Sequence, residues 1–182
     1  NANLSLNLVD LAPTIENVIG SEQNDVVIGN SLGNRLEGRG GIDGLAGLNG
    51  ADTLVGGAGT DLLSGGADND WYEFDADSSL GTDVILDSGG VDGFNFSETT
   101  TQAIQINLGN TAGPQPVNAN LTIHITPAAL IENVTGGALG DQLTGNGADN
   151  VISGGLGDDT INGAGGTDTV QEFRDDQFEL TN

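Results

Sequence analysis

The sequence predicts an all-β fold, a parallel β-solenoid built in two tandem repeat blocks. Two features of the 182 residues carry this prediction. A nine-residue period runs through both blocks, and one apolar residue recurs at a fixed place inside it, as expected for a very short strand with one side chain pointing inward. In addition, no stretch shows a convincing helical period.

The composition indicates a chain that cannot collapse on apolar side chains alone. Asp and Glu number 27 against three basic residues, the net charge is −24, and aromatic residues make up only 4%. Such a chain is either disordered or neutralised by something cationic. The charge also argues against nucleic acid and anionic membrane surfaces as partners, because both need a basic patch. No apolar run is long enough for membrane insertion, and without Cys there is no disulfide or zinc thiolate site.

Ten nonamers form two runs, residues 20–73 and 136–171. Position 1 is Gly in all ten, position 6 is Asp in eight with Asn34 and Asn150 as exceptions, and position 8 is apolar or aromatic in all ten. Positions 1 to 6 suit a turn with unusual backbone angles, and positions 7 to 9 suit a short strand. Two nonamers therefore make one turn of a flattened coil, which places every second Asp over its neighbour on the same edge.

Stacked carboxylates a few ångströms apart repel one another strongly. A divalent cation between adjacent turns removes this repulsion. Calcium fits because it accepts several carboxylate and carbonyl oxygens in a flexible geometry, whereas magnesium demands a small octahedron and keeps its waters. The simpler alternative is that Asp merely favours turns. Ten in-phase glycines with eight in-phase aspartates favour ligation instead.

These nonamers resemble the RTX, or hemolysin-type, calcium-binding nonapeptide repeat, G-G-x-G-x-D-x-U-x. GGAGTDLLS (56–64) and GGLGDDTIN (154–162) match every defined position, and the resemblance covers 90 of the 182 residues. It implies a calcium-bound parallel β-roll in a secreted bacterial protein. Such proteins typically leave the cell unfolded through a type I secretion channel and fold outside when they meet calcium.

The resemblance also implies the ligands. In the family, one turn supplies the carbonyls of positions 2 and 4 and its Asp, and the turn two nonamers later supplies the carbonyls of positions 1 and 3 and its own Asp. The sites that carry over with Asp on both turns are Asp25 and Asp43 with the carbonyls of Ser21, Gln23, Gly38 and Gly40; Asp43 and Asp61 with those of Arg39, Gly41, Gly56 and Ala58; Asp52 and Asp70 with those of Leu48, Gly50, Gly65 and Ala67; and Asp141 and Asp159 with those of Gly137, Leu139, Gly154 and Leu156.

Two further sites should be weak or empty, because Asn34 faces Asp52 and Asn150 faces Asp168, and an amide oxygen brings no charge. Residues 81–98 look like the segment that often closes an RTX block. There, Asp70 is expected to meet Asp92 with the carbonyls of Asp87 and Gly89. In total we expect about four to six calcium ions.

The chain is internally duplicated. NANLSLNL (1–8) recurs as NANLTIHI (118–125), and IENVIG (15–20) recurs as IENVTG (131–136). Residues 111–120 hold two prolines and a glycine, which indicates a loop. We therefore expect a first strand and β-roll block over residues 1–110, a linker over 111–117, and a shorter second block with an acidic tail over 118–182.

The leading functional hypothesis is a non-catalytic, extracellular calcium-binding module that folds on binding calcium and has a structural role in a secreted or cell-surface bacterial protein. A second is a self-assembling surface-layer, filament or adhesin subunit, because a coil has two open ends. A third is the C-terminal repeat region of a secreted enzyme. The chain holds no HExxH zinc motif, and we expect no enzymatic activity in it. The expected partners are calcium and, under the second hypothesis, further copies of the chain.

Overall fold

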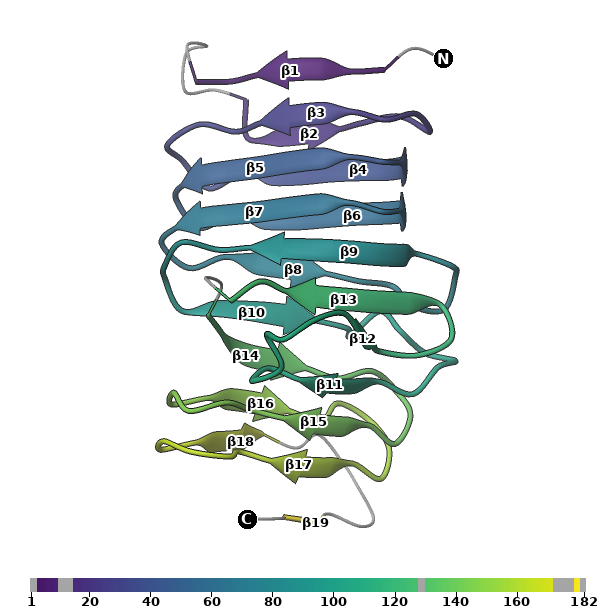
Figure 1. Cartoon of the computed structure of the whole chain (residues 1–182), viewed down its shortest axis with the longest axis vertical. Coiled ribbons are helices and arrows are strands. Elements are labelled where there is room, and N and C mark those ends of the chain that lie inside the picture. Colours follow the sequence, from purple (N-terminus) through teal and green to yellow (C-terminus); the bar gives the residue numbers. More distant parts are fainter. Residues whose placement is uncertain (1–2, 10–14, 128–129, 172–178, 181–182) are drawn as a thin grey trace.

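The protein is a parallel β-solenoid (Figure 1), which confirms the predicted fold class. The computed structural model describes residues 3–9, 15–127, 130–171 and 179–180. Regular structure in these ranges consists of strands, and no helix there could cross a membrane. The acidic tail predicted over the last residues lies outside the described part apart from 179–180.

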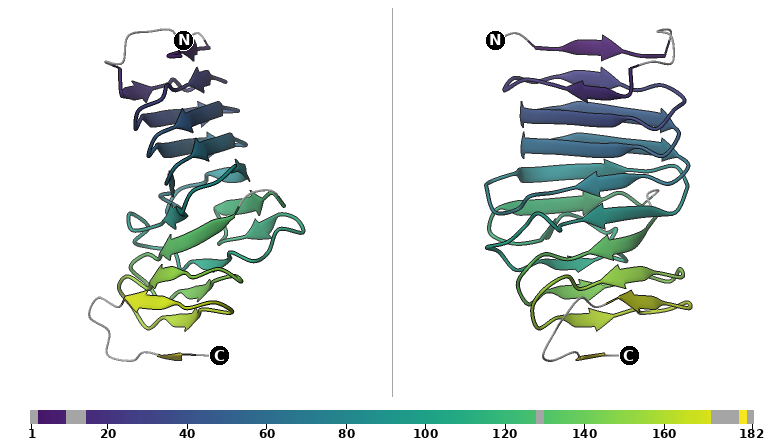
Figure 2. Two further views of the ribbon diagram at one scale, coloured as in Figure 1. Left: turned by 90° about the vertical axis from the view of Figure 1, so that its left-hand side faces the viewer. Right: turned by 180° about the vertical axis from the view of Figure 1, so that it is seen from behind.

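Short strands stack into two faces, and nearly all of them pair in parallel (Figure 2). One face contains β1 (Ser5–Asn7), β3 (Val26–Ile28), β5 (Gly44–Asn49), β7 (Leu62–Ala67), β9 (Gly81–Leu86) and β13 (Leu121–Ile125). The other contains β2 (Asn17–Ile19), β4 (Arg35–Gly41), β6 (Thr53–Gly59), β8 (Trp71–Glu73), β10 (Asp92–Asn95), β14 (Ile131–Thr135), β16 (Val151–Ser153) and β18 (Thr169–Gln171). A separate sheet in the second block contains β11 (Gln105–Asn107), β15 (Gln142–Thr144), β17 (Thr160–Asn162) and β19 (Glu179–Leu180).

The register places the apolar residues of position 8 directly over one another. Leu36 pairs with Leu54, and Leu54 pairs with Tyr72, while Leu45 and Leu63 are aligned in the same way on the other face. All five side chains are buried. Because full burial of one such side chain contributes about 1.5–3 kcal/mol, this narrow column supplies the apolar driving force of a chain that has few large apolar residues.

The strands of the first block are longer than the nonamer pattern alone suggests. β4 continues through its turn, so that Arg39 pairs with Gly57 and Gly41 with Gly59. The turn backbones therefore stack on one another with the same parallel register as the strands. Consecutive turns on one edge are thereby held at a fixed spacing.

One sheet runs through both repeat blocks. β10, at the end of the first block, pairs with β8 on one side and with β14 of the second block on the other. Four aromatic rings fill the core at this junction, among them Phe94, which packs edge-on against Tyr72 at 5.9 Å. Within the segment 111–117, β12 (Gln115–Pro116) pairs antiparallel with β13, and Gln115 and Val117 are buried.

Candidate functional site

Aspartate side chains form a hydrogen-bonded column on each edge of the roll. On one edge, Asp61 Oδ1 accepts the backbone N–H of Asp43 at 2.8 Å, and on the other, Asp70 Oδ1 accepts that of Asp52 at 2.8 Å. Each of these pairs spans 18 residues, the length of two nonamers. The same bond recurs from Asp25 to Asp43, Asn34 to Asp52, Asp61 to Asp83, Asp70 to Asp92, Asp141 to Asp159 and Asn150 to Asp168.

Six aspartates of these columns have a buried second carboxylate oxygen that receives no hydrogen bond from the described residues. No described residue donates a hydrogen bond to Oδ2 of Asp43, Asp52, Asp61, Asp70, Asp83 or Asp92. A buried oxygen with formal negative charge and no partner is strongly destabilising. The column therefore favours a bound positive charge, and a hard divalent ion suits carboxylate oxygens best.

Backbone carbonyls face the same spaces. A Cβ atom added to Gly38 would collide with Asp43 Oδ2 and with the carbonyl oxygen of Gly56. One added to Gly47 would meet Asp52 Oδ2 and the carbonyl of Gly65 in the same way. The carboxylate of one turn and the position-1 carbonyl of the next thus converge beside a glycine. This mixed oxygen set is the one that calcium prefers.

The turns are of two kinds, distinguished at position 2. In the first kind, position 2 has a positive φ, as at Arg39 (82°) and Leu48 (90°). In the second, the position-2 N–H donates to the position-6 side chain of the same turn, as Ser21 does to Asp25 Oδ2 at 2.6 Å. Gly57, Gly66, Gly155 and Ala164 share the positive φ, whereas Asn30, Gly137 and Asn146 donate to Asn34, Asp141 and Asn150.

This difference bears on the predicted ligands. Asp25 and Asp141 each already accept a backbone N–H from their own turn at Oδ2. The calcium sites between Asp25 and Asp43 and between Asp141 and Asp159 remain predictions. In each, a backbone N–H already bonds to the first carboxylate and would compete with the ion. Arg39 and Leu48, predicted to contribute carbonyls, both lie in turns of the first kind.

The two turns with Asn at position 6 also belong to the second kind, because the N–H groups of Asn30 and Asn146 donate to Asn34 and Asn150. The Asn150 side-chain amide also donates to the Glu132 carbonyl at 2.8 Å. Asp168, the partner of Asn150 along the column, is only half-buried. The expectation that these sites are weak or empty remains a prediction.

Burial shifts the acidity of the columns. It raises the pKa of Asp52 and of Asp61 to about 6, that of Asp70 and of Asp92 to about 7, and that of Asp83 to about 8. At Asp83, the negative charge of the neighbouring Asp61 raises the pKa further. Asp25 is different: burial works to raise its pKa, but the N–H groups of Leu4 and Ser21 lower it below the ordinary value. Without a cation, the columns therefore hold protons near neutral pH.

Sequence reasoning placed no ligand role on Asp83 or Glu132. Asp83 continues one column after Asp61, although 22 residues separate them. The sequence feature that points to Asp83 is its nine-residue spacing to Asp92. Glu132 Oε2 accepts the N–H of Asp92 at 2.8 Å, which continues the other column into the second block. The sequence feature that points to Glu132 is its position two residues before Val134, because the Asp of each nonamer lies two residues before the apolar position 8.

The structure brings Asp70 and Asp92 together and adds a third, unexpected group. The carboxylate of Asp87 lies with theirs, all three within 4.8 Å of one another. Sequence reasoning had assigned Asp87 only a carbonyl.

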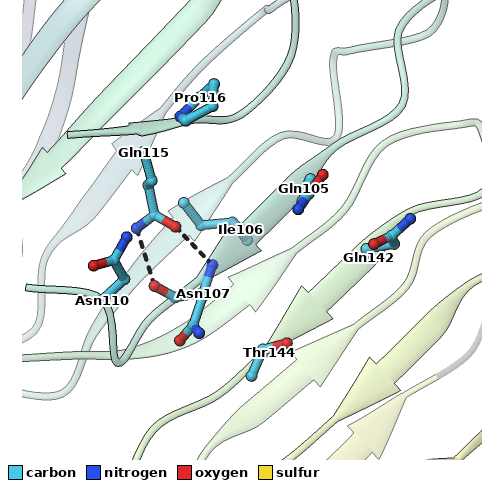
Figure 3. A pocket seen from close by; sticks show the side chains of 8 residues that line it. All are labelled: Gln105, Ile106, Asn107, Asn110, Gln115, Pro116, Gln142 and Thr144. Carbon is cyan, nitrogen blue, oxygen red and sulfur yellow. Dashed lines mark hydrogen bonds between the residues drawn. The ribbon is translucent and has the colours of Figure 1, made fainter.

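A pocket of about 370 Å³ lies over β11 and β15 (Figure 3). Its lining contains amide, hydroxyl and apolar groups but no charged side chain. Both ends of the Gln115 side-chain amide are hydrogen-bonded to the backbone of Asn107. Its oxygen accepts the Asn107 N–H and its nitrogen donates to the Asn107 carbonyl, each at 3.0 Å. The pocket therefore offers no acid or base for catalysis.

One G-x-S-x-G pattern occurs in the chain, at residues 29–33. In hydrolases this pattern carries a nucleophile on a strand-to-helix turn. Here it forms the turn between β3 and β4, and Ser31 is exposed. The pattern is part of a repeat turn and lacks the context of a nucleophile.

Comparison with known proteins agrees with this geometry. A family model described as the RTX calcium-binding nonapeptide repeat (4 copies) matches residues 37–72, 46–80 and 135–170. These ranges fall in both repeat blocks. No curated protein matches the chain significantly.

Proposed function

We propose, from the match of residues 37–80 and 135–170 to the RTX calcium-binding nonapeptide repeat, that the chain is an extracellular, non-catalytic module that folds on binding calcium and serves a structural role. RTX repeats occur in secreted bacterial proteins, and modules of this kind are typically structural rather than catalytic. Export by a type I channel in the unfolded state fits a chain whose folding waits for an external ion.

The observation that carries the proposal is the set of buried Oδ2 atoms that receive no hydrogen bond from the described residues. On one edge Asp43, Asp61 and Asp83 present such oxygens at successive turns, and on the other Asp52, Asp70 and Asp92 do so. Calcium bound between these turns supplies positive charge where the fold otherwise leaves repulsion. About four to six ions in all fit this arrangement.

The chain's own residues would hold the ion in two well-defined gaps. The proposed ligands between Asp43 and Asp61 are the carbonyls of Arg39, Gly41, Gly56 and Ala58, and those proposed between Asp52 and Asp70 are the carbonyls of Leu48, Gly50, Gly65 and Ala67. An ion that binds only the folded chain adds its binding free energy to folding. Extracellular calcium modules bind with dissociation constants of about 10⁻⁴ to 10⁻³ M, so such sites stay empty in a cytosol and fill outside.

A calcium titration of two matched variants, followed by far-UV circular dichroism, tests this proposal. Asp61→Asn removes a charge from the column, whereas Glu98→Gln removes one from the exposed surface. Asp61→Asn should raise the calcium midpoint by about tenfold or more, since loss of even an outer partner costs a metal site that much. Glu98→Gln should leave it near the parent value. Equal midpoints for both variants would contradict the assignment of the column.

A second candidate function is end-to-end assembly. β13, which carries the repeated NANL sequence, stacks in parallel on β9. β1 carries the first copy of that sequence, and within the described residues it pairs only with β3. In this candidate, the edge of β1 that pairs with no described strand stacks on another roll in the way that β13 stacks on β9. Sedimentation velocity across calcium concentrations tests this candidate: growing particles support it, and a monomer throughout rejects it.

A further inference from the structure

Three buried carboxylates meet at the end of the first repeat block. Asp70 precedes β8, Asp87 follows β9, and Asp92 begins β10. One oxygen of each lies within 4.8 Å of the other two. Their exposed fractions are 0%, 6% and 0%. Three negative charges at this distance, without solvent, repel one another strongly.

Asp87 stands where the repeats keep a glycine. It lies five residues before Asp92, the offset between position 1 and position 6, and position 1 is Gly in all ten nonamers. In the ordinary repeats the missing side chain leaves space for a carboxylate and a carbonyl. Here a third carboxylate occupies that space.

The orientation of Asp87 is set by two hydrogen bonds. The Tyr72 hydroxyl donates to its Oδ2, and the Gly89 N–H donates to Oδ1 at 3.0 Å. The same hydroxyl accepts the N–H of Gly65 at 2.8 Å. Tyr72 is buried in the core, so it holds the Asp87 carboxylate at a fixed place beside the column.

A separate observation points to a ligand in this cluster. Asp70 Oδ2 and Asp92 Oδ2 are both buried, and neither receives a hydrogen bond from the described part of the chain. The cluster thus combines one positioned carboxylate with two oxygens that lack partners. The repeat gaps offer two carboxylates each, so this gap carries one more negative charge than they do.

We propose that Asp70, Asp87 and Asp92 form a divalent cation site of a different kind, with higher affinity than the repeat sites, which fills first. Oxygen sites for calcium gain affinity with ligand charge, and the third carboxylate supplies that charge. The proposal deepens the proposed function, since it takes calcium as the resident ion. It also places the first ion at the joint between the blocks, because the Asp92 N–H donates to Glu132 of the second block.

Terbium luminescence of the full chain tests the proposal. Tb³⁺ replaces Ca²⁺ at oxygen sites and emits when a nearby aromatic group is excited. The chain has one Tyr and one Trp. Tyr72 contacts Asp87, and Trp71 is adjacent to Asp70 in sequence, so this site should be sensitised more strongly than the other gaps. The first equivalent of Tb³⁺ added to the calcium-free chain should therefore produce most of the emission.

Two variants and one control then identify the ligand. Asp87→Gly restores the residue of the repeats, and Asp87→Asn keeps the size without the charge. Both variants should weaken binding of the first equivalent of Tb³⁺ by about tenfold or more. Glu98→Gln, which removes a carboxylate from the exposed surface, should leave binding of the first equivalent unchanged. Both Asp87 variants should still reach the parent circular dichroism spectrum at saturating calcium.

The proposal is overturned if either Asp87 variant binds the first equivalent as tightly as the parent, or if Glu98→Gln weakens it equally. Failure of the function proposed above has a different signature: the parent itself would show no structural response to calcium. A parent that folds with calcium but is insensitive to Asp87 keeps the general function and rejects this site.

Discussion

Asp61 Oδ1 accepts the backbone N–H of Asp43 at 2.8 Å, while Asp61 Oδ2 is buried and receives no hydrogen bond from any residue that the structure describes. One oxygen therefore sets the stacking of the turns, and the other remains available for a cation. On the opposite edge, Asp70 Oδ1 likewise accepts the N–H of Asp52, and Asp70 Oδ2 receives no hydrogen bond from the described residues. This arrangement connects the fold to calcium binding through a single side chain.

Filling the space beside a position-1 glycine should impair calcium binding. Gly38→Ala places a Cβ against Asp43 Oδ2 and the Gly56 carbonyl, so the calcium midpoint should rise by about tenfold. Gly44→Ala is the control, because a Cβ there meets nothing within 4 Å. Calcium titrations of both by far-UV circular dichroism check the prediction. It fails if the two alanines behave alike.

The chelated chain should lose stability as the pH rises. Burial raises the pKa of Asp61 to about 6 and that of Asp83 to about 8, above the ordinary value of 3.8. The folded state thus binds more protons than the unfolded state between about pH 4 and pH 8, so the free energy of unfolding falls across that window. Far-UV circular dichroism of the chelated chain between pH 4 and pH 8 measures this as a β-signal that falls with rising pH. A β-signal that grows with pH would contradict it.

Calcium should reverse this dependence. The ion needs deprotonated carboxylates, so apparent calcium affinity should increase between pH 5 and pH 8. Titrations at the two pH values supply the comparison with the chelated chain.

Removing a strained side chain should stabilise the calcium-loaded protein. Leu48 has a φ of 90°, which costs a residue with a Cβ roughly 1–2 kcal/mol. Leu48→Gly should therefore raise the free energy of unfolding by about 1 kcal/mol. Leu156→Gly, at another exposed turn position without a positive φ, should lower it instead. Urea unfolding at saturating calcium distinguishes these signs, and destabilisation by both would reject the strain at Leu48.

The apolar column should be sensitive to truncation at its centre. Leu54 is fully buried between Leu36 and Tyr72, so Leu54→Ala should cost about 2–5 kcal/mol. Leu62→Ala, on a side chain that is 45% exposed, should change stability by roughly 0.5 kcal/mol or less. The same urea experiment applies. A small cost at Leu54 would mean that the column does not form the core.

Much of this architecture follows from the nine-residue period. The period alone predicts that Leu36 lies over Leu54 and that Asp43 lies over Asp61, because parallel strands two nonamers apart must share a register. The nine-residue spacing recurs between Asp83 and Asp92, but Asp83 received no ligand role, because 22 residues rather than 18 separate it from Asp61. For the regular part of the roll, sequence reasoning was sufficient.

Three features could not be predicted in this way. Whether Ser21 caps Asp25 depends on a backbone angle at position 2 that many residues can adopt. The inward direction of Asp87 depends on the Tyr72 hydroxyl, which comes from a different turn. The contact of Glu132 with Asp92 depends on how the second block stacks on the first, across 40 residues of chain.

The central claim is that calcium between stacked carboxylates holds the fold together. The most direct measurement is far-UV circular dichroism of the parent chain during removal of calcium with a chelator and its subsequent return, with magnesium at equal concentration as the comparison. The account predicts that β-structure is lost near neutral pH without calcium, returns with calcium and does not return with magnesium. A spectrum that is unchanged by the chelator would contradict it.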